Sequence, residues 1–325
     1  MKNKTLHYPF LMLCALLFAL FGNMKQANAY DFFLPLGNNE VYFTITDQPN
    51  HYVEYVCPNE SNFSWDGYTK PSGILDLPGT FEYNGTTYTA TSIGHGAFYG
   101  CSAIYAVTIP STVTSMESDA FQGTSLAQVN INSNAIASHT YTSIYNFQRL
   151  FGGNVDNYTF GEGVTAIGPC ALDGCDFMSS VTLPNTLTTI GYSAFEGCSA
   201  LESVVLPNSL TTIGNAAFRN CTQLTSVTIP ASLTSIQDMA FDGCYNLNAV
   251  YISSIAAWCG IQFENNSVLP SNPLIYAHHL YDSNSGSEIT NLVIPSWVTS
   301  INSYAFYGLT GIQSVTFPLD RCWSI

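Results

Sequence analysis

The feature that most constrains this chain is a repeat of 23 positions that runs from residue 164 to residue 252. Its four copies read VTAIGPCALDGCDFMSSVTLPNT, LTTIGYSAFEGCSALESVVLPNS, LTTIGNAAFRNCTQLTSVTIPAS and LTSIQDMAFDGCYNLNAVYISSI. A fixed period of about 20 to 50 residues is typical of a solenoid, in which each coil buries its apolar row against the next. We therefore expect stacked coils, none of which folds alone.

The order of residues within one repeat predicts how a coil is built. Val227-x-Ile229 alternates apolar and hydroxyl side chains, which is the period of a half-buried strand, and Pro230 ends that strand. Residues 233–236 predict a second short extended piece. The following Ala-Phe-x-Gly-Cys segment is too short for a free helix and favours one helical or 3₁₀ turn.

One slot of this turn requires an unusual backbone conformation. Gly197 and Gly243 stand two positions after the phenylalanine and directly before the cysteine of their repeats. Asn220 takes the same slot in its repeat. Glycine and, less readily, asparagine tolerate a positive φ, so we expect a left-handed residue there.

The consensus L-T-x-I-x-x-x-A-F-x-G-C-x-x-L-x-x-V-x-I-P resembles the bacterial surface leucine-rich repeats of the BspA-like family. The resemblance implies a leucine-rich-repeat solenoid, mainly β, with stacked parallel strands and short helical or 3₁₀ turns. It also implies a surface-exposed binding or adhesion protein rather than an enzyme.

Residues 1–29 predict a secretory signal peptide. Lys2 and Lys4 give a basic start, residues 10–21 are apolar, and Ala27-Asn28-Ala29 offers a small-x-small cleavage site. The apolar run is shorter than the ~20 residues that span a bilayer as a helix. We therefore expect export, to the medium or the surface of a bacterium, without membrane insertion of the mature chain.

The presence or absence of the repeat divides the rest of the chain into a cap, a solenoid and a tail. Residues 30–90 lack it but contain strand patterns and an Asn84-Gly85 hairpin turn, which predict a β-rich N-terminal cap. Residues 91–318 carry the solenoid, with enlarged coils at 132–157 and 253–288. Residues 319–325 form a tail that does not continue the unit.

The charge balance argues against two classes of partner. Removal of residues 1–29 leaves four cations, Lys70, Arg149, Arg219 and Arg321, against 22 acidic residues. So few cations disfavour binding to nucleic acid or to an anionic membrane. Charged residues are only 9% of the chain, so the coils must expose mainly Ser, Thr, Asn, Gly and Tyr.

The cysteines are predicted to be structural. One slot of the repeat holds Cys175, Cys198, Cys221 and Cys244, a row that suits buried thiols better than disulfides, whose dihedral angle parallel side chains fit poorly. A linear row also cannot give zinc a tetrahedral site. The pairs considered for a disulfide are Cys170 with Cys175, Cys57 with Cys101, and Cys259 with Cys322.

No catalytic, cofactor or metal site is predicted. His278 and His279 are adjacent, so in a strand they would point to opposite faces. The acidic residues of the repeats occupy different slots from coil to coil. The sequence contains no Walker loop, dinucleotide fingerprint or nucleophile elbow.

The outward positions of the predicted strands form the candidate interaction face. They include Val205 and Ala249, and the residues assigned to the face are Ser180, Thr182, Ser203, Ser226, Thr228, Tyr251, Ser314 and Thr316. Solenoids commonly bind through such an extended face; alternatively, small hydroxyl side chains simply suit solvated strands. The enlarged coils carry aromatic residues that could anchor a partner or fill the coil interior, namely Tyr141, Tyr145, Phe147, Trp258 and Phe263.

These observations favour a repeat protein that binds extracellular proteins of a host matrix, host cells or other bacteria. The first alternative is a carbohydrate-binding module, which aromatic side chains exposed in a groove would favour. The second is a structural component of the cell envelope that has no ligand.

Overall fold

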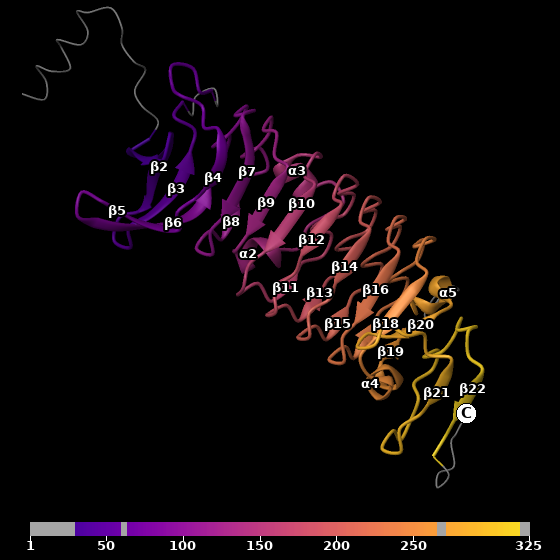
Figure 1. The fold of residues 1–325 in the computed structure, drawn as a ribbon. Helices are drawn as coiled ribbons and strands as arrows, with labels where there is room; N and C mark the ends of the chain where they lie inside the picture. Colours follow the sequence, from indigo (N-terminus) through magenta and orange to yellow (C-terminus); the bar gives the residue numbers. More distant parts are fainter. Residues whose placement is uncertain (1–29, 60–63, 265–270, 319–325) are drawn as a thin grey trace, which may run out of the picture.

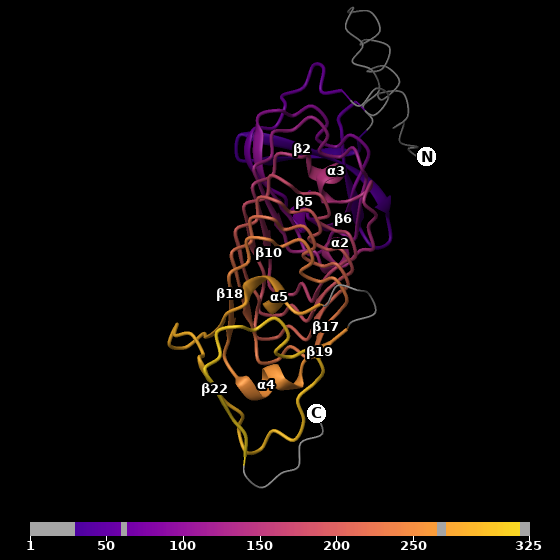
Figure 2. The same ribbon diagram turned by 90° about the vertical axis from the view of Figure 1, so that its right-hand side faces the viewer.

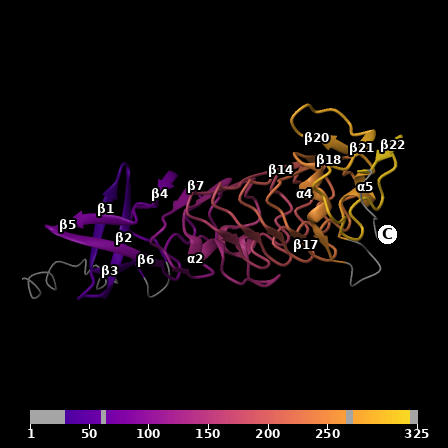
Figure 3. The ribbon, with the colours of Figure 1, turned by 90° about the horizontal axis from the view of Figure 1, so that it is seen from below.

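The computed structural model describes residues 30–59, 64–264 and 271–318, which form one elongated solenoid (Figure 1). A β-rich cap lies at one end and the last two strands lie at the other (Figure 3). The predicted leucine-rich-repeat solenoid is confirmed. The segments assigned to the signal peptide, 1–29, and to the tail, 319–325, lie outside the described residues.

The cap is a sheet in the order β1-β2-β3-β6-β5, with β8 paired to β6. Its strands are β1 (Phe32–Leu36), β2 (Asn39–Asp47), β3 (Tyr52–Val56), β5 (Thr80–Tyr83), β6 (Thr86–Ile93) and β8 (Ser115–Met116). The predicted hairpin is present, since β5 and β6 pair antiparallel around Asn84 and Gly85, whose φ angles are 50° and 78°. The cap covers the first apolar face, with Phe43 and Tyr55 fully buried.

Parallel strands of successive coils form the principal face of the solenoid. The first sheet contains β4 (Gly73–Asp76), β7 (Ile104–Ile109), β9 (Gln128–Ile131), β10 (Asn157–Phe160) and β12 (Ser180–Thr182). The second contains β14 (Ser203–Val205), β16 (Ser226–Ile229), β18 (Ala249–Ile252) and β20 (Leu280–Asp282), and the third contains β21 (Asn291–Val293) and β22 (Ser314–Thr316). The principal face therefore starts at β4, inside the range expected for the cap.

A narrower sheet of two-residue strands runs along the other side of the coils (Figure 2). Its members are β11 (Ala166–Ile167), β13 (Thr189–Ile190), β15 (Thr212–Ile213), β17 (Ser235–Ile236) and β19 (Gln262–Phe263). The isoleucine slot pairs in register from coil to coil, as in Ile190 with Ile213. These side chains are buried, so the repeat period translates directly into a continuous apolar core.

The Ala-Phe corner joins neighbouring coils by backbone hydrogen bonds. Phe195 N donates to Ala217 O and Phe218 N donates to Ala240 O, each at 2.8 Å. Within the corner the bonds run from i+3 to i, as the expected 3₁₀ turn requires, for example from Cys198 N to Phe195 O. A continuous helix is prevented because left-handed residues interrupt it.

The left-handed slot before Cys is confirmed: φ is 72° at Gly197, 76° at Gly243 and 59° at Asn220. A second left-handed slot was not predicted. It stands two positions before Phe and is occupied by Ser193, Ala216 and Met239, with φ between 49° and 55°. Gly96, two positions before Phe98, has φ 59° in the same slot, but none of these three residues is glycine, so the 164–252 repeat itself gave no sign of it.

The cysteine slot forms a buried ladder of thiols. Cys198 Sγ donates to Leu172 O, Cys221 Sγ to Phe195 O and Cys244 Sγ to Phe218 O, at 3.1 to 3.2 Å. Burial raises the pKa of Cys244 to about 12, so the thiol stays protonated at neutral pH. Each thiol thus ties its coil to the preceding one.

The two disulfides that can be checked are wrong. Cys57, Cys101, Cys170 and Cys175 form no disulfide, and the first two direct their thiols at the backbone oxygens of Ser64 and Tyr99. The third pairing cannot be compared, because Cys322 lies outside the described residues.

The enlarged coils contain the short helices α2 (Asn134–Ala137), α3 (Phe147–Phe151), α4 (Ile255–Gly260) and α5 (Leu274–Ala277). Side-chain oxygens of Ser133, Asn146 and Ser254 cap the first three by accepting a hydrogen bond from the third following residue. Tyr141, Phe147, Trp258 and Phe263 are buried, which confirms core filling, whereas Tyr145 remains 36% exposed.

Candidate functional site

The outward face of the principal sheets follows from the alternation within each strand. In β14 and β16 the central Val204 and Val227 are 4% and 1% exposed, so they point into the core. The flanking Ser203 and Val205 are exposed, and Val205 shows 76% of its surface. Inward valine and outward hydroxyl positions therefore lie where the sequence pattern predicted them.

The structure brings part of the predicted face together. Ser203 pairs with Ser226, and Thr228 pairs with Tyr251, on adjacent strands of the sheet β14-β16-β18-β20. Ser226, Thr228 and Tyr251 are half-buried between their neighbours. These four residues and Val205 form the central patch of the face.

The other predicted face residues lie on separate sheets. Ser180 and Thr182 are exposed on β12, which lies beside β14 without ladder hydrogen bonds. Ser314 and Thr316 are exposed on β22, at the end of the solenoid. The predicted face is thus spread over three separate sheets rather than one uninterrupted stripe.

One expected outward position is wrong. Ala249 is only 6% exposed, and its strand β18 is bordered by α5 and β20 of the lengthened coil. In the regular coils a short strand of the next coil lies beside this slot, and the side chain in the slot stays accessible. Beside β18 the lengthened coil also places helix α5, which covers Ala249.

Sequence reasoning missed Tyr281 and an amide row formed by Gln128 and Asn157, which pair in register on β9 and β10. Tyr281 pairs with Tyr251, and the two ring centroids lie 5.1 Å apart. Asn157 stands next to Ser180 and donates to its hydroxyl oxygen at 2.7 Å. The strand alternation around residues 128–160 could have revealed the amide row, but the register of Tyr281 is hidden by the insertion before it.

The charged groups of the coils lie mainly at the turns. Arg219 donates to Asp242 at 3.2 Å and to Glu196 at 3.5 Å, and so joins three successive coils through equivalent slots. His95 lies 3.1 Å from Asp119 and 3.5 Å from Glu117. Among these pairs, the arginine contacts reinforce the coil stacking, whereas His95 lies on the exposed surface.

Burial and neighbouring acids raise the pKa of one turn carboxyl group, that of Asp173, with Glu196 as its nearby charge. His278 and His279 do not share a strand: His278 ends α5 with φ 59°, and His279 Nδ1 lies 2.7 Å from Glu288 Oε1.

Within the described ranges, no group of three or more His, Cys, Asp or Glu side chains could hold a metal ion. The part of the chain that is described also contains no helix long and apolar enough to cross a membrane.

Comparison with known families gives one match that covers most of the chain. The family described as BspA type leucine-rich repeat region matches in 6 copies, over residues 82–151, 142–269 and 282–321. No curated protein matches the chain.

Several solved structures are similar in fold. A leucine-rich repeat protein from Bacteroides ovatus is 22% identical, with a TM-score of 0.42 over 89% of this chain and 65% of that protein. This chain therefore spans less than two thirds of that relative. A leucine-rich cell surface protein from Faecalibacterium prausnitzii is 18% identical, with a TM-score of 0.39 over 89% of this chain and 96% of that one. A T. pallidum leucine-rich repeat protein is 23% identical, with a TM-score of 0.36 over 64% and 77% of the two chains.

Proposed function

The chain belongs to the BspA-type leucine-rich repeat family, and we propose that it is an extracellular protein that binds other proteins through the central patch. Proteins built from leucine-rich repeats generally bind proteins at a surface. The partner class proposed here is a protein of a host matrix, a host cell or another bacterium. Export rests on the leader pattern of residues 1–29.

The observation that supports this proposal best is a row of side chains in register across four strands. Val205, Thr228, Tyr251 and Tyr281 stand side by side on β14, β16, β18 and β20. The row combines the exposed Val205 with two adjacent tyrosine rings, and interface centres are enriched in aromatic residues such as tyrosine.

The surroundings of this row are also suited to a protein partner. None of the outward positions of β14, β16 and β18 carries a formal charge. Charged residues are depleted from the centres of interfaces, because each buried charge must be desolvated and paired. Short side chains such as Ser203 and Ser226 keep this part of the sheet flat and low in conformational entropy.

The test is to place charges on the patch and measure binding. Purified protein is tested against matrix proteins, host cells and bacterial cells, first unchanged and then with Ser203→Asp, Ser226→Asp and Thr228→Asp. Burying an unpaired carboxylate in an interface costs about 2–5 kcal/mol, so affinity should fall by tenfold or more per substitution. Circular dichroism should show an unchanged fold.

A matched control is Asn208→Asp, which adds the same charge at an exposed turn after β14 and outside the patch. It should leave the affinity within about twofold, since a distant surface charge is screened. Retained affinity in the folded patch variants would move the binding site to the enlarged coils. Failure to bind any protein or cell would favour a structural role in the envelope.

A further inference from the structure

The ladder of parallel strands is interrupted after β20, and a hollow opens at the interruption. Beyond β20 the chain turns back on itself: Asp282 N donates to Ser287 O at 2.9 Å, and Ile289 N donates to Leu280 O at 2.7 Å. The returning segment 287–289 takes the edge on which the next coil would otherwise add its strand. Strand β21 pairs with β22 instead.

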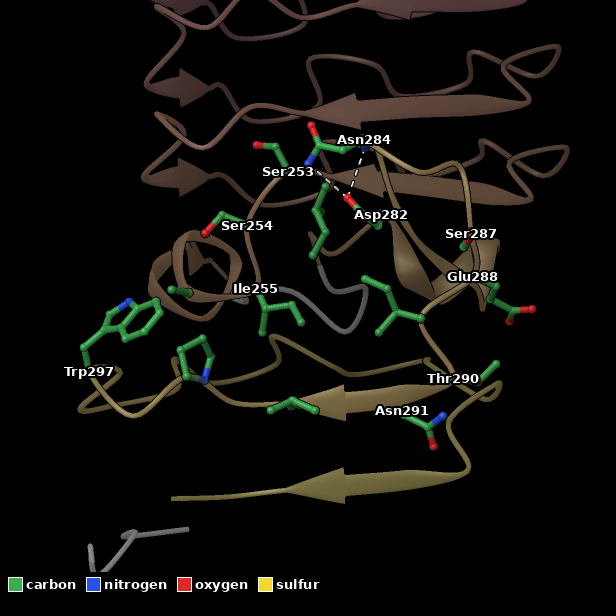
Figure 4. A pocket seen from close by; sticks show the side chains of 15 residues that line it. Ser253, Ser254, Ile255, Asp282, Asn284, Ser287, Glu288, Thr290, Asn291 and Trp297 are labelled. Atoms are coloured by element: carbon green, nitrogen blue, oxygen red, sulfur yellow. Dashed lines mark hydrogen bonds between the residues drawn. The ribbon is translucent and has the colours of Figure 1, made fainter. Parts of the chain in front are cut away.

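The hollow has a volume of about 570 Å³ (Figure 4). Ligand sites in proteins typically measure about 300–1,000 Å³ and combine apolar walls with a few polar groups. This hollow has both kinds of lining: Ile252, Ile255, Ile289 and Pro295 are apolar, whereas Ser253, Asp282, Asn284 and Asn291 are polar. Among the residues that the structure describes, no lysine or arginine lines it.

Trp297 lies at one end of the hollow (Figure 4) and exposes 72% of its surface. The other two described tryptophans, Trp65 and Trp258, are 2% and 1% exposed. A large aromatic surface in water is costly unless a partner covers it. Its flat face matches a ligand that has an apolar face and polar edges.

Asp282 supplies a carboxylate that is already held in place. Its Oδ1 accepts hydrogen bonds from Asn284 N at 3.0 Å and Asn284 Nδ2 at 3.1 Å, and its Oδ2 accepts from Ser285 Oγ at 2.9 Å. These bonds, led by the one from the Asn284 backbone, lower the pKa of Asp282. A carboxylate has about four lone-pair positions, so three bonds leave one free for a ligand hydroxyl.

We propose that this hollow binds a short neutral oligosaccharide. The C–H face of one sugar ring stacks on the indole of Trp297, and a hydroxyl of another ring of the same glycan donates to Asp282, because the two side chains lie apart in the lining of the hollow (Figure 4). Serine and asparagine side chains of the lining meet the remaining hydroxyl groups. The protein is acidic and no lysine or arginine is among the described residues that line the hollow, so it should repel sulfated, phosphorylated or uronic sugars. We therefore expect an uncharged ligand. This glycan site is independent of the proposed protein-binding patch.

Tryptophan fluorescence tests the site directly. Trp323 lies outside the described residues, so it is first replaced by Phe. The remaining tryptophans are then the buried Trp65 and Trp258 and the exposed Trp297. This protein is titrated with neutral oligosaccharides of glucose, galactose, mannose and N-acetylglucosamine. We expect a saturable blue shift with at least one of them. Trp297→Ala should weaken binding of that sugar, measured by calorimetry, by about tenfold, or about 1.4 kcal/mol.

The control is Tyr192→Ala, which removes an aromatic ring of similar exposure, 54%, from a coil far from the hollow. It should change the affinity by less than about twofold, as should Ser203→Asp on the protein-binding patch. Asp282→Asn, which keeps an acceptor for Asn284 N, should weaken binding of the sugar and leave the fold intact. Three outcomes overturn the proposal: no neutral sugar binds, only acidic sugars bind, or Trp297→Ala binds as well as the native protein.

Discussion

The regular coils at 164–252 and the irregular region at 253–318 solve the same stacking problem differently. In the regular coils one backbone bond repeats, from the Phe N–H of one coil to the Ala C=O of the next. After β18, side chains make the hydrogen bonds at this corner of the coil. Trp258 Nε1 and Asn272 Nδ2 donate to Ala305 O at 2.7 and 3.0 Å, and the Tyr276 hydroxyl accepts from Gly243 N at 3.1 Å.

This difference separates what repetition provides from what insertion provides. Identical coils bury an unbroken column of side chains, including Phe195, Phe218 and Phe241, whose rings stack at 5.1 and 5.4 Å. The last coils have a small apolar cluster of their own and leave Val315 and Phe317 nearly half-exposed. Insertion costs burial, but it opens the hollow beside Trp297. The regular coils therefore hold the unbroken buried column, whereas the proposed sugar site lies in the irregular region.

The largest expected effect contrasts two phenylalanines in the same slot. Phe218 is fully buried in the ring column, so Phe218→Ala should lower the free energy of unfolding by about 3–5 kcal/mol. Phe306, in the last coil, is only partly buried, so Phe306→Ala should cost about 1–2 kcal/mol. Urea denaturation followed by circular dichroism measures both.

Hydrogen exchange would locate these losses. Phe218→Ala should speed exchange throughout the regular coils, whereas Phe306→Ala should speed it only beyond β20, because nearest-neighbour coupling in solenoids is local. Equal losses from the two substitutions would show that the terminal coils are as tightly integrated as the central ones.

The second contrast concerns alkaline pH and two buried thiols. Burial raises the pKa of Cys244, in the thiol ladder, to about 12 and that of Cys259, in the lengthened coil, to about 11, both from 9.0. Because the folded pKa lies above the unfolded value, the unfolded chain loses its proton first. Stability is therefore full below pH 9 and falls as pH rises toward the folded pKa, by about 1.4 kcal/mol per pH unit for each thiol.

Replacing either cysteine by alanine removes its share of this slope. Urea denaturation at pH 8, 10 and 11.5 should show a shallower decline for Cys244→Ala over the whole range, and for Cys259→Ala only up to about pH 11. The cavity left by each substitution lowers stability equally at all pH values and so does not affect the slope. An unchanged slope in Cys244→Ala would mean that its thiol is not buried in the folded protein.

The extent to which sequence predicts this molecule follows the same division. Val227 inward, Thr228 outward and the left-handed Asn220 could all be predicted, because a repeated register fixes each slot. The burial of Ala249, the role of the Tyr276 hydroxyl and the exposure of Trp297 could not. Each depends on how a unique insertion folds back on the last regular coil, and a chain segment without a repeat carries no register from which to place its side chains.

The smallest expected effect concerns the left-handed slot, which both regions share: φ is 54° at Ala216 in a regular coil and 66° at Tyr304 in the last one. A non-glycine residue in this conformation costs about 1–2 kcal/mol. Ala216→Gly relieves that strain while losing one buried methyl group, so its stability should stay within about 0.5 kcal/mol of the native protein or exceed it.

The matched control is the adjacent Ala217, which is equally buried but does not have a positive φ. Ala217→Gly loses the methyl group and gains only freedom in the unfolded chain, so it should cost about 1–2 kcal/mol. Thermal unfolding of the two variants side by side measures the difference. If both lose the same stability, the corner is not held in the left-handed conformation, and the stacking of Phe195, Phe218 and Phe241 must be maintained by the ring contacts and not by the backbone turn.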